Sequence, residues 1–143
     1  PAHFLKLGID VVEALAIDLE AMGMTGADAP VLVQCFDRDC LERVRLRTGL
    51  RVVQLSIDLP PLDDAPIAGY GVSKQALASA DGAAFIAAAH DRGRLVHAWT
   101  FRDDQPHESL TPIDECAAAF SRGIDGLFCD FPATGLGARR ALR

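Results

Sequence analysis

Short runs of apolar residues, most of them followed by a helical pattern, constrain the fold of this chain more than any other feature. The residues in these runs are apolar at consecutive positions, whereas a strand with one solvent-facing side alternates apolar and polar residues. Consecutive apolar positions predict parallel strands that are covered on both faces. The predicted strands are VLVQCF (31–36), RVVQLSI (51–57), RLVHAWTF (94–101) and GLFCD (126–130), with IAGYGVS (67–73) as a weaker strand interrupted by glycines.

Helical patterns lie between most of these strands. The expected helices occupy 9–22, a short stretch around 41–45, the residues after the cap Asp81, the residues after the cap Thr111, and the end of the chain. The helix after Thr111 has the clearest start, because Pro112 suits the first turn and Asp114 completes a capping box. The proline-rich stretch 59–66 is a loop. This order predicts an α/β fold in one piece, with no internal repeat and no long linker.

Two architectures fit this order of elements: an open, doubly wound sheet and part of a (β/α)₈ barrel. A complete barrel needs about 250 residues. This chain has 143 residues, little more than half of that number. In both architectures the functional site lies at the carboxyl ends of the strands. The strand ends at 34–37, 69–71, 99–102 and 129–132 therefore carry the candidate site residues.

Composition narrows the classes of ligand. The formal net charge is −6, and no basic stripe is present for phosphate neutralisation, so we expect no nucleic-acid partner. No apolar run approaches the roughly 20 residues that span a bilayer, so we expect no membrane span. The four cysteines form no CxxC pair and no zinc spacing. We expect them to be mostly buried free thiols, with a disulfide as the alternative for an exported protein.

Several stretches resemble the closing segment of bacterial glycerophosphodiester phosphodiesterases. VHAWTFRDD (96–104) carries an aromatic-Thr-x-Arg motif, and GIDGLFCDFPATG (123–135) carries a Gly-x-x-x-Asp-x-Pro motif. VLVQCFDRDCLERV (31–44) resembles a strand of that family that ends in Gln-Ser-Phe, with Cys35 where serine is common. IAGYGVSKQAL (67–77) and AAHDRGRLVHAW (88–99) follow in the family's order. The resemblance covers nearly the whole chain, and the Thr-Phe-Arg version is common in the exported, longer branch.

The resemblance implies a fold and an activity. The fold is the carboxy-terminal part of a (β/α)₈ TIM-type barrel with parallel strands and outer helices, and residues 1–143 are the carboxy-terminal portion of one phosphodiesterase domain. The activity is metal-dependent hydrolysis of glycerophosphodiesters to an alcohol and sn-glycerol 3-phosphate. The family's catalytic histidines, and the carboxylates that hold its Ca²⁺ or Mg²⁺, belong to motifs that this sequence lacks. We therefore expect no catalytic residue and no metal ligand here, and an inactive chain when it is alone.

The resemblance selects four of the residues at these strand ends as candidate site residues and gives each of them a role. Gln34 would donate to a phosphate oxygen or to the glycerol, Phe36 and Trp99 would clamp the glycerol backbone, and Arg102 would offset the phosphate charge. A structural interpretation stands beside each role: a buried amide that satisfies the backbone for Gln34, core packing for Phe36 and Trp99, and a surface pair with Asp103 or Asp104 for Arg102.

Two alternative functions remain open: a related barrel lyase acting on phospholipids, and a non-catalytic α/β module that binds a ligand. The expected partners are a small-molecule glycerophosphodiester and either the missing amino-terminal half or a second copy of the chain. The expected location is the periplasm or the exterior, with the cytoplasm as the alternative.

Other residues receive structural interpretations. We expect His97 in the core, His90 at a helix carboxyl end, and Glu13, Asp18 and Glu20 on a solvated helix face. Gly135 and Gly137 mark either a helix start that binds an anion or an ordinary turn before a helix.

Overall fold

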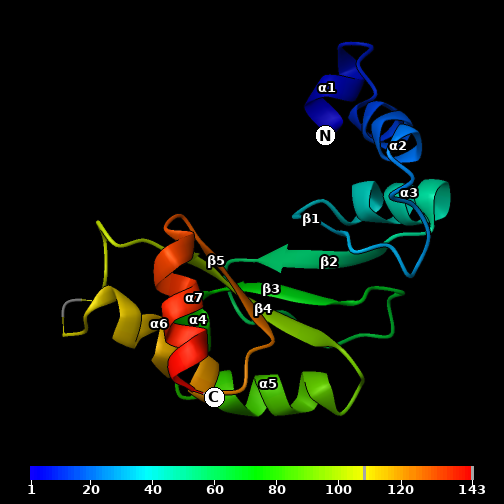
Figure 1. Cartoon of the computed structure of the whole chain (residues 1–143). Helices are drawn as coiled ribbons and strands as arrows, with labels where there is room; N and C mark the ends of the chain where they lie inside the picture. The colour runs from blue at the N-terminus through cyan, green and yellow to red at the C-terminus, as the bar shows by residue number, and fades with distance from the viewer. Residues whose placement is uncertain (108, 143) are drawn as a thin grey trace. The chain divides into compact units, whose positions relative to one another are not determined.

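The chain divides into two compact units, which comprise Pro1–Leu55 with Pro66–Ala68, and Ser56–Ala65 with Gly69–Arg143. The computed structural model describes residues 1–107 and 109–142 (Figure 1). The elements from the first unit are α1 (Ala2–Lys6), α2 (Val11–Ala21), β1 (Leu32–Cys35), α3 (Arg38–Thr48) and β2 (Arg51–Ser56). Those of the second are β3 (Gly69–Ser73), α4 (Lys74–Ala78), α5 (Gly82–His90), β4 (Leu95–Phe101), α6 (Pro112–Ser121), β5 (Gly126–Cys129) and α7 (Pro132–Ala141).

In the first unit, β1 and β2 pair in parallel, with Gln34 opposite Val53 and Cys35 opposite Gln54. The β1–α3 connection is short because Asp37 caps α3 directly after the strand, accepting the N–H of Cys40 at 3.1 Å. Leu19, Ala29 and Leu50 form a small buried cluster. The parallel pairing therefore places the carboxyl ends of β1 and β2 at the same edge of the sheet.

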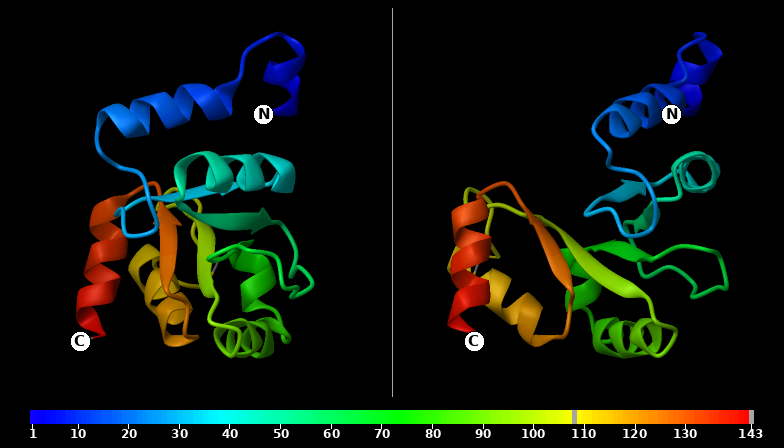
Figure 2. Two further views of the ribbon diagram at one scale, coloured as in Figure 1. Left: turned by 90° about the vertical axis from the view of Figure 1, so that its right-hand side faces the viewer. Right: turned by 45° about the vertical axis from the view of Figure 1, so that its right-hand side comes forward.

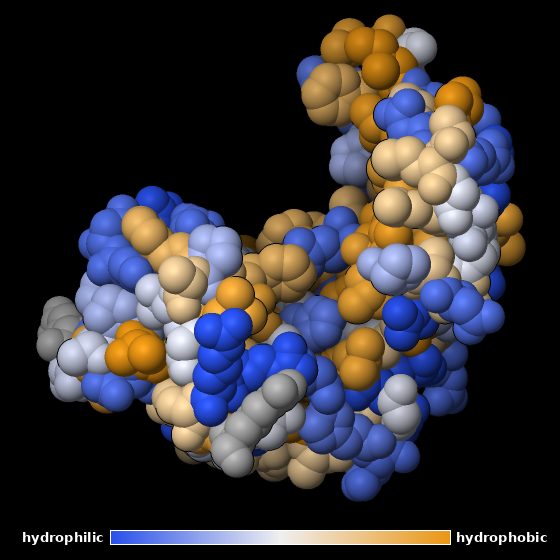
Figure 3. Space-filling view, in the orientation of Figure 1, coloured by the Kyte–Doolittle hydropathy of each residue, from blue (hydrophilic) through white to orange (hydrophobic). Residues whose placement is uncertain are grey.

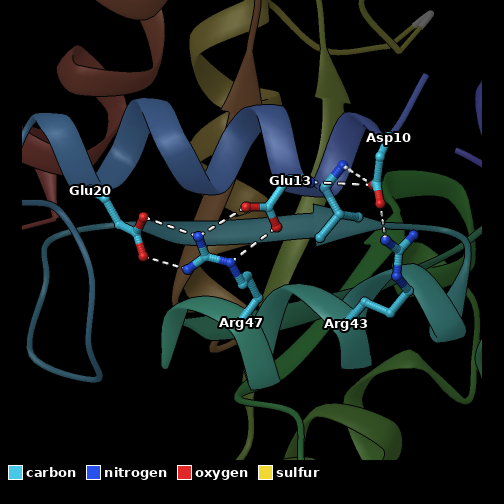
Figure 4. Close-up of polar contacts among 6 residues, drawn as sticks. Asp10, Glu13, Glu20, Arg43 and Arg47 are labelled. Atoms are coloured by element: carbon cyan, nitrogen blue, oxygen red, sulfur yellow. Dashed lines mark hydrogen bonds and ion pairs between the residues drawn. The ribbon is translucent and has the colours of Figure 1, made fainter. Parts of the chain in front are cut away.

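Helices α2 and α3 are joined by charged side chains (Figure 4). Arg47 on α3 forms ion pairs with Glu13 and Glu20 on α2, and Arg43 pairs with Asp10, the cap of α2. Glu13 and Glu20 are exposed, as expected for a solvated helix face, and they also form these ion pairs. The paired side chains are 35–48% exposed, and exposed ion pairs contribute little to stability. Their effect is to orient α2 against α3.

In the second unit, β3, β4 and β5 are parallel, with β4 between the other two. Helices α4 to α7 lie on one side of these strands, and α6 lies beside α7 (Figure 2). Every residue of β3 is buried, and Tyr70, Val72 and Val96 have no exposed surface. The glycine-broken run that looked weakest in the sequence is thus a fully buried strand.

Several boundaries differ from the expectations. The short helices α1 and α4 were not expected, because five residues are too few to show a helical period. Asp81 occupies the cap position of α5, but its side chain makes no capping hydrogen bond. Thr111 caps α6 as expected, with its hydroxyl accepting the N–H of Asp114 at 3.3 Å. Gly135 lies inside α7, whose cap is Phe131, so the expected helix start at the glycines is wrong.

Gly69 on β3 lies too close to the backbone of β4 to accommodate a side chain. A Cβ atom at Gly69 would lie 2.2 Å from the carbonyl oxygen of Leu95, its partner on β4. We expect Gly69→Ala to lower the free energy of unfolding by roughly 2–3 kcal/mol, because the clash is with backbone and cannot relax by a rotamer change. Urea denaturation followed by circular dichroism measures this change.

Gly137→Ala is the matched control for Gly69→Ala. A Cβ atom at Gly137 would meet only the tip of Ile113 at 3.2 Å, and Ile113 is 43% exposed and can move. This variant should keep or raise the stability by up to about 1 kcal/mol, because alanine is the better helix former. Equal losses in the two variants would contradict the close approach at Gly69.

Candidate functional site

Two candidate residues lie at the carboxyl end of β1. Gln34 is exposed although it belongs to the strand, and the side chain of Phe36, just beyond the strand, is 56% exposed. The interpretation of Phe36 as a core residue is therefore wrong, and so is the interpretation of Gln34 as a buried amide. Both side chains are available for contact with a ligand.

The buried amide of this region is Gln54, which sequence reasoning missed. Gln54 lies on β2 opposite Cys35 and is 8% exposed. Its Nε2 donates to the carbonyl oxygens of Phe36 and Leu55, at 3.0 Å each. A buried amide that ties two strand ends holds the backbone of Phe36 in place. The sequence feature that could have pointed to Gln54 is its position at the centre of the mostly apolar run RVVQLSI (51–57).

Trp99 lies near the carboxyl end of β4 in the second unit. Its ring is half-buried, and its Nε1 donates to the carbonyl oxygen of Gly71 on β3 at 2.9 Å. The register between β4 and β5 shifts by one residue here. Ala98 is opposite Leu127, whereas Phe101, three residues later, is opposite Cys129, two residues later. Such a bulge turns a side chain away from the regular strand direction. The indole is thus anchored at one edge and partly open to solvent.

Arg102 follows Phe101 at the same end of β4. Its guanidinium lies 3.2 Å from Asp104 and 3.4 Å from Asp130, and its side chain is 43% exposed. The hydrogen bonds that Arg102 donates to the Asp104 carboxylate raise the pKa of Arg102 above its ordinary value, so the group stays charged. Asp103 instead accepts the hydroxyl of Thr134 at 2.6 Å. Of the two surface partners expected for Arg102, Asp104 is confirmed, and Asp130 is an additional one.

The histidines of this unit have structural roles. His97 is half-buried, and burial lowers its pKa below the ordinary value. Its ring meets that of Phe128 edge-on, with 6.0 Å between the centroids. The Nε2 of His90 lies 2.9 Å from Oδ2 of Asp125, which also accepts the N–H of Val96. These contacts agree with the structural interpretations of His97 and His90.

A cavity of about 260 Å³ lies between α4, α6 and β4. Lys74 and Glu115 form an ion pair at its wall, 2.9 Å apart, and both side chains are nearly buried. The ammonium of Lys74 also lies 5.4 Å from the centroid of the Phe101 ring. Neither Trp99 nor Arg102 lines this cavity, so it is separate from the candidate site.

The structure thus describes two pairs of candidate residues, one pair in each unit. Gln34 and Phe36 share the carboxyl end of β1, and Trp99 and Arg102 share that of β4. Among residues 1–107 and 109–142, no group of three or more His, Cys, Asp or Glu side chains could hold a metal ion. In the same described ranges, no helix has the length and apolarity that a membrane crossing requires.

Known proteins resemble the chain in sequence pattern and in fold. The model of the glycerophosphoryl diester phosphodiesterase family matches residues 6–134. No curated protein matches the chain at a significant level.

Solved structures resemble the chain at low sequence identity, and three of them illustrate the likeness. A protein from Silicibacter pomeroyi DSS-3 assigned as a glycerophosphoryl diester phosphodiesterase has a TM-score of 0.69 at 17% identity, covering 92% of this chain and 44% of that one. A glycerophosphodiester phosphodiesterase from Parabacteroides distasonis ATCC 8503 has a TM-score of 0.65 at 15% identity, covering 94% and 56%. That of Thermotoga maritima has a TM-score of 0.56 at 18% identity, covering 94% and 55%.

These likenesses establish the fold. The chain is part of a TIM-type barrel with parallel strands and outer helices, as the sequence predicted. It spans about half the length of the solved structures that it matches.

The buried amide of Gln54 generates a stability prediction. We expect Gln54→Leu to cost about 1–3 kcal/mol, because two carbonyl oxygens lose their donor in a buried place. Gln34→Leu, on the neighbouring strand and exposed, should stay within about 0.5 kcal/mol of the parent. Chemical denaturation of both variants measures the difference. A larger loss for Gln34→Leu would mean that the structural and ligand-facing glutamines have been interchanged.

Proposed function

This chain belongs to the glycerophosphoryl diester phosphodiesterase family, and we propose that it forms the carboxy-terminal part of a barrel that hydrolyses glycerophosphodiesters. The products are an alcohol and sn-glycerol 3-phosphate. The observation that carries the proposal is the family match over residues 6–134. The positions of the candidate residues at strand carboxyl ends support it, since that edge forms the active site of barrel enzymes.

Within this proposal, the chain supplies part of the wall that binds the substrate. The exposed amide of Gln34 donates to a phosphate or glycerol oxygen, and the exposed ring of Phe36 packs against the glycerol carbons. Gln54 keeps the backbone under Phe36 fixed through its hydrogen bond to the Phe36 carbonyl. Because this part of the wall is already ordered, the protein loses little conformational entropy there when the substrate binds.

Trp99 and Arg102 contribute from the end of β4. The hydrogen bond from Nε1 of Trp99 to the Gly71 carbonyl engages only the edge of the indole ring. The face of the ring then makes the apolar contact with the glycerol. Arg102 is charged and partly exposed, but Asp104 and Asp130 already neutralise it. For Arg102 to offset a phosphate charge, the phosphate must replace one of these carboxylates. Arg102 therefore contacts the phosphate only after an exchange of ion-pair partners, whereas Trp99 needs no such rearrangement.

The described residues, 1–107 and 109–142, do not fit a cation site. The resemblance implies Ca²⁺ or Mg²⁺ in the intact enzyme, but the described residues contain no cluster that could hold a metal. A cation in such enzymes neutralises charge on the phosphodiester. We place its ligands, and the catalytic histidines, outside this chain. The chain alone is then inactive.

The barrel partner follows from the same proposal. Phe4, Leu7 and Ile17, from the first two helices and their connection, are 47–62% exposed, and apolar side chains gather over α1 (Figure 3). Exposed apolar patches of this kind mark surfaces that another protein part covers. We propose that the other half of the barrel, or a second copy of the chain, covers exposed apolar surface. Export to the periplasm or exterior stays a prediction.

Trp99 tests the proposed wall. In the protein expressed from its native reading frame, Trp99→Ala should raise the KM for glycerophosphocholine about tenfold, a loss of roughly 1.4 kcal/mol of binding. The turnover number should change less, because Trp99 holds no proton that the reaction moves. An enzymatic assay coupled to oxidation of sn-glycerol 3-phosphate gives both constants.

Phe101→Ala is the matched control for Trp99→Ala. Phe101 lies two residues along β4 and is only 2% exposed. Its truncation should cost about 3–5 kcal/mol and lower the melting temperature sharply, whereas Trp99→Ala should lower it less. A collapse in the melting temperature of Trp99→Ala, with an unchanged KM in the folded fraction, would show that Trp99 is a core residue.

The absence of a metal cluster from the described residues predicts the behaviour of the chain towards cations. Calorimetric titration of the 143-residue chain with Ca²⁺ or Mg²⁺ should show no binding in the micromolar range. The protein from the native reading frame should lose activity with a chelator and recover it with one of these cations. Micromolar binding by this chain would overturn the placement of the ligands outside it.

A further inference from the structure

The cysteines form two pairs, and each pair lies within one unit. Cys35 at the end of β1 lies close to Cys40 in the first turn of α3, and its sulfur contributes to raising the pKa of the Cys40 thiol. Cys129 at the end of β5 affects the pKa of Cys116 on α6 in the same way. All are free thiols. The two pairs differ in access, because Cys35 and Cys40 are both partly exposed whereas Cys116 is buried.

The β1–α3 turn holds the first pair together. Asp37 donates its N–H to the sulfur of Cys35 at 3.4 Å, and its carboxylate accepts the N–H of Cys40 at 3.1 Å. On the other side, Gln54 fixes the backbone just after Cys35 through the Phe36 carbonyl. The two sulfurs are therefore neighbours because the backbone around them is tied, not because two mobile side chains happen to meet.

We propose that Cys35 and Cys40 are a thiol–disulfide exchange site that reacts with low-molecular-weight disulfides and forms an intrachain disulfide. Cys35 and Cys40 flank a short turn that Asp37 ties, which favours the first requirement of such a bond, that the two Cβ atoms lie close. Both residues are partly exposed, which favours the second, access of the oxidant. This chemistry is independent of the phosphodiesterase activity.

The two thiols take different parts in the exchange. Burial raises the pKa of Cys40 to about 11, and the Cys35 sulfur beside it adds to this effect, so Cys40 keeps its proton. The sulfur of Cys35 accepts hydrogen bonds from its surroundings. Cys35 is therefore the thiol that attacks first, and Cys40 is the one that resolves the intermediate.

The reaction balances with oxidised glutathione as the oxidant. The Cys35 thiolate attacks one sulfur of the glutathione disulfide, forms a mixed disulfide and releases one glutathione. Cys40 loses its proton to solvent and attacks the Cys35 sulfur, which releases the second glutathione. Two cysteine thiols are oxidised and one glutathione disulfide is reduced to two thiols.

The second pair provides an internal comparison. Cys116 is 1% exposed, and burial raises its pKa to about 12. The sulfur of Cys129 donates to the carbonyl oxygen of Phe131 at 3.1 Å. A buried thiol is not accessible to a disulfide in solution, whereas Cys40 is partly exposed and reacts only with the mixed disulfide beside it. We therefore expect oxidation to be confined to Cys35 and Cys40 while the chain stays folded.

Peptide mapping tests the proposal directly. The folded chain is incubated with oxidised glutathione, trapped with iodoacetamide and digested with trypsin. Cleavage after Arg38 separates Cys35 from Cys40, and cleavage after Arg122 separates Cys116 from Cys129, so each disulfide would join two different peptides. We expect the linked pair that contains Cys35 and Cys40, with carboxamidomethylated Cys116 and Cys129.

Two variants separate the roles of the thiols. Cys40→Ser should stop at the mixed disulfide, with one glutathione on Cys35, and dithiothreitol should remove it. Cys35→Ser should leave Cys40 as a free thiol. The proposal is overturned if the parent chain gains glutathione without forming the linked peptides, if Cys116 and Cys129 oxidise first, or if Cys40 reacts equally well in Cys35→Ser. Circular dichroism of each variant confirms that the folded state is compared.

Discussion

Parallel pairing within each unit is the constraint on which the rest of the structure depends. It places the carboxyl ends of β1 and β2 at one edge of the first unit and those of β3, β4 and β5 at one edge of the second. The pairing of β3 with β4 requires Gly69, because a Cβ there would overlap the Leu95 carbonyl. Polar and aromatic residues that follow the strands then gather at those edges, whatever the loops between them contain.

Side-chain donors stabilise the backbone near the candidate residues by satisfying carbonyl groups. Gln54 donates to the carbonyl of Phe36, just beyond β1, and Trp99 donates to the carbonyl of Gly71, in the middle of β3. The Phe36 carbonyl lies beyond the strand pairing, so a side-chain donor takes the place of a strand partner there. The same bonds leave the ring of Phe36 and part of Trp99 open. Structural and ligand-facing roles thus lie side by side at each strand end.

Local patterns in the sequence predicted the strands and most helices. Strand runs such as RLVHAWTF (94–101) are visible because burial on both faces requires consecutive apolar residues, and the helix at Thr111 is visible because capping is local chemistry. The opposite burial of Gln34 and Gln54 did not follow from the sequence. Both are single glutamines within mostly apolar strands, and only the three-dimensional environment of each strand decides which one is buried.

Features that depend on spatial neighbours were also beyond sequence reasoning. The partners of Arg102 include Asp130, which lies far along the chain, and the contact of Cys35 with Cys40 depends on the tight turn capped by Asp37. The resemblance to the phosphodiesterase family came from the order of motifs along nearly the whole chain, and the family match over 6–134 confirms it. Resemblance of that kind identifies the family but not the contacts that each residue makes.

The identity of the reaction products tests the central claim most directly. Phosphorus NMR of glycerophosphocholine, incubated with the protein from its native reading frame and a divalent cation, follows every phosphorus-containing species at once. The account predicts that the diester signal is replaced by that of sn-glycerol 3-phosphate, with free choline in equal amount. A cyclic phosphate would indicate a lyase, phosphocholine would indicate cleavage of the other ester bond, and an unchanged diester would indicate a binding module. Any of these three results would contradict the proposed hydrolysis.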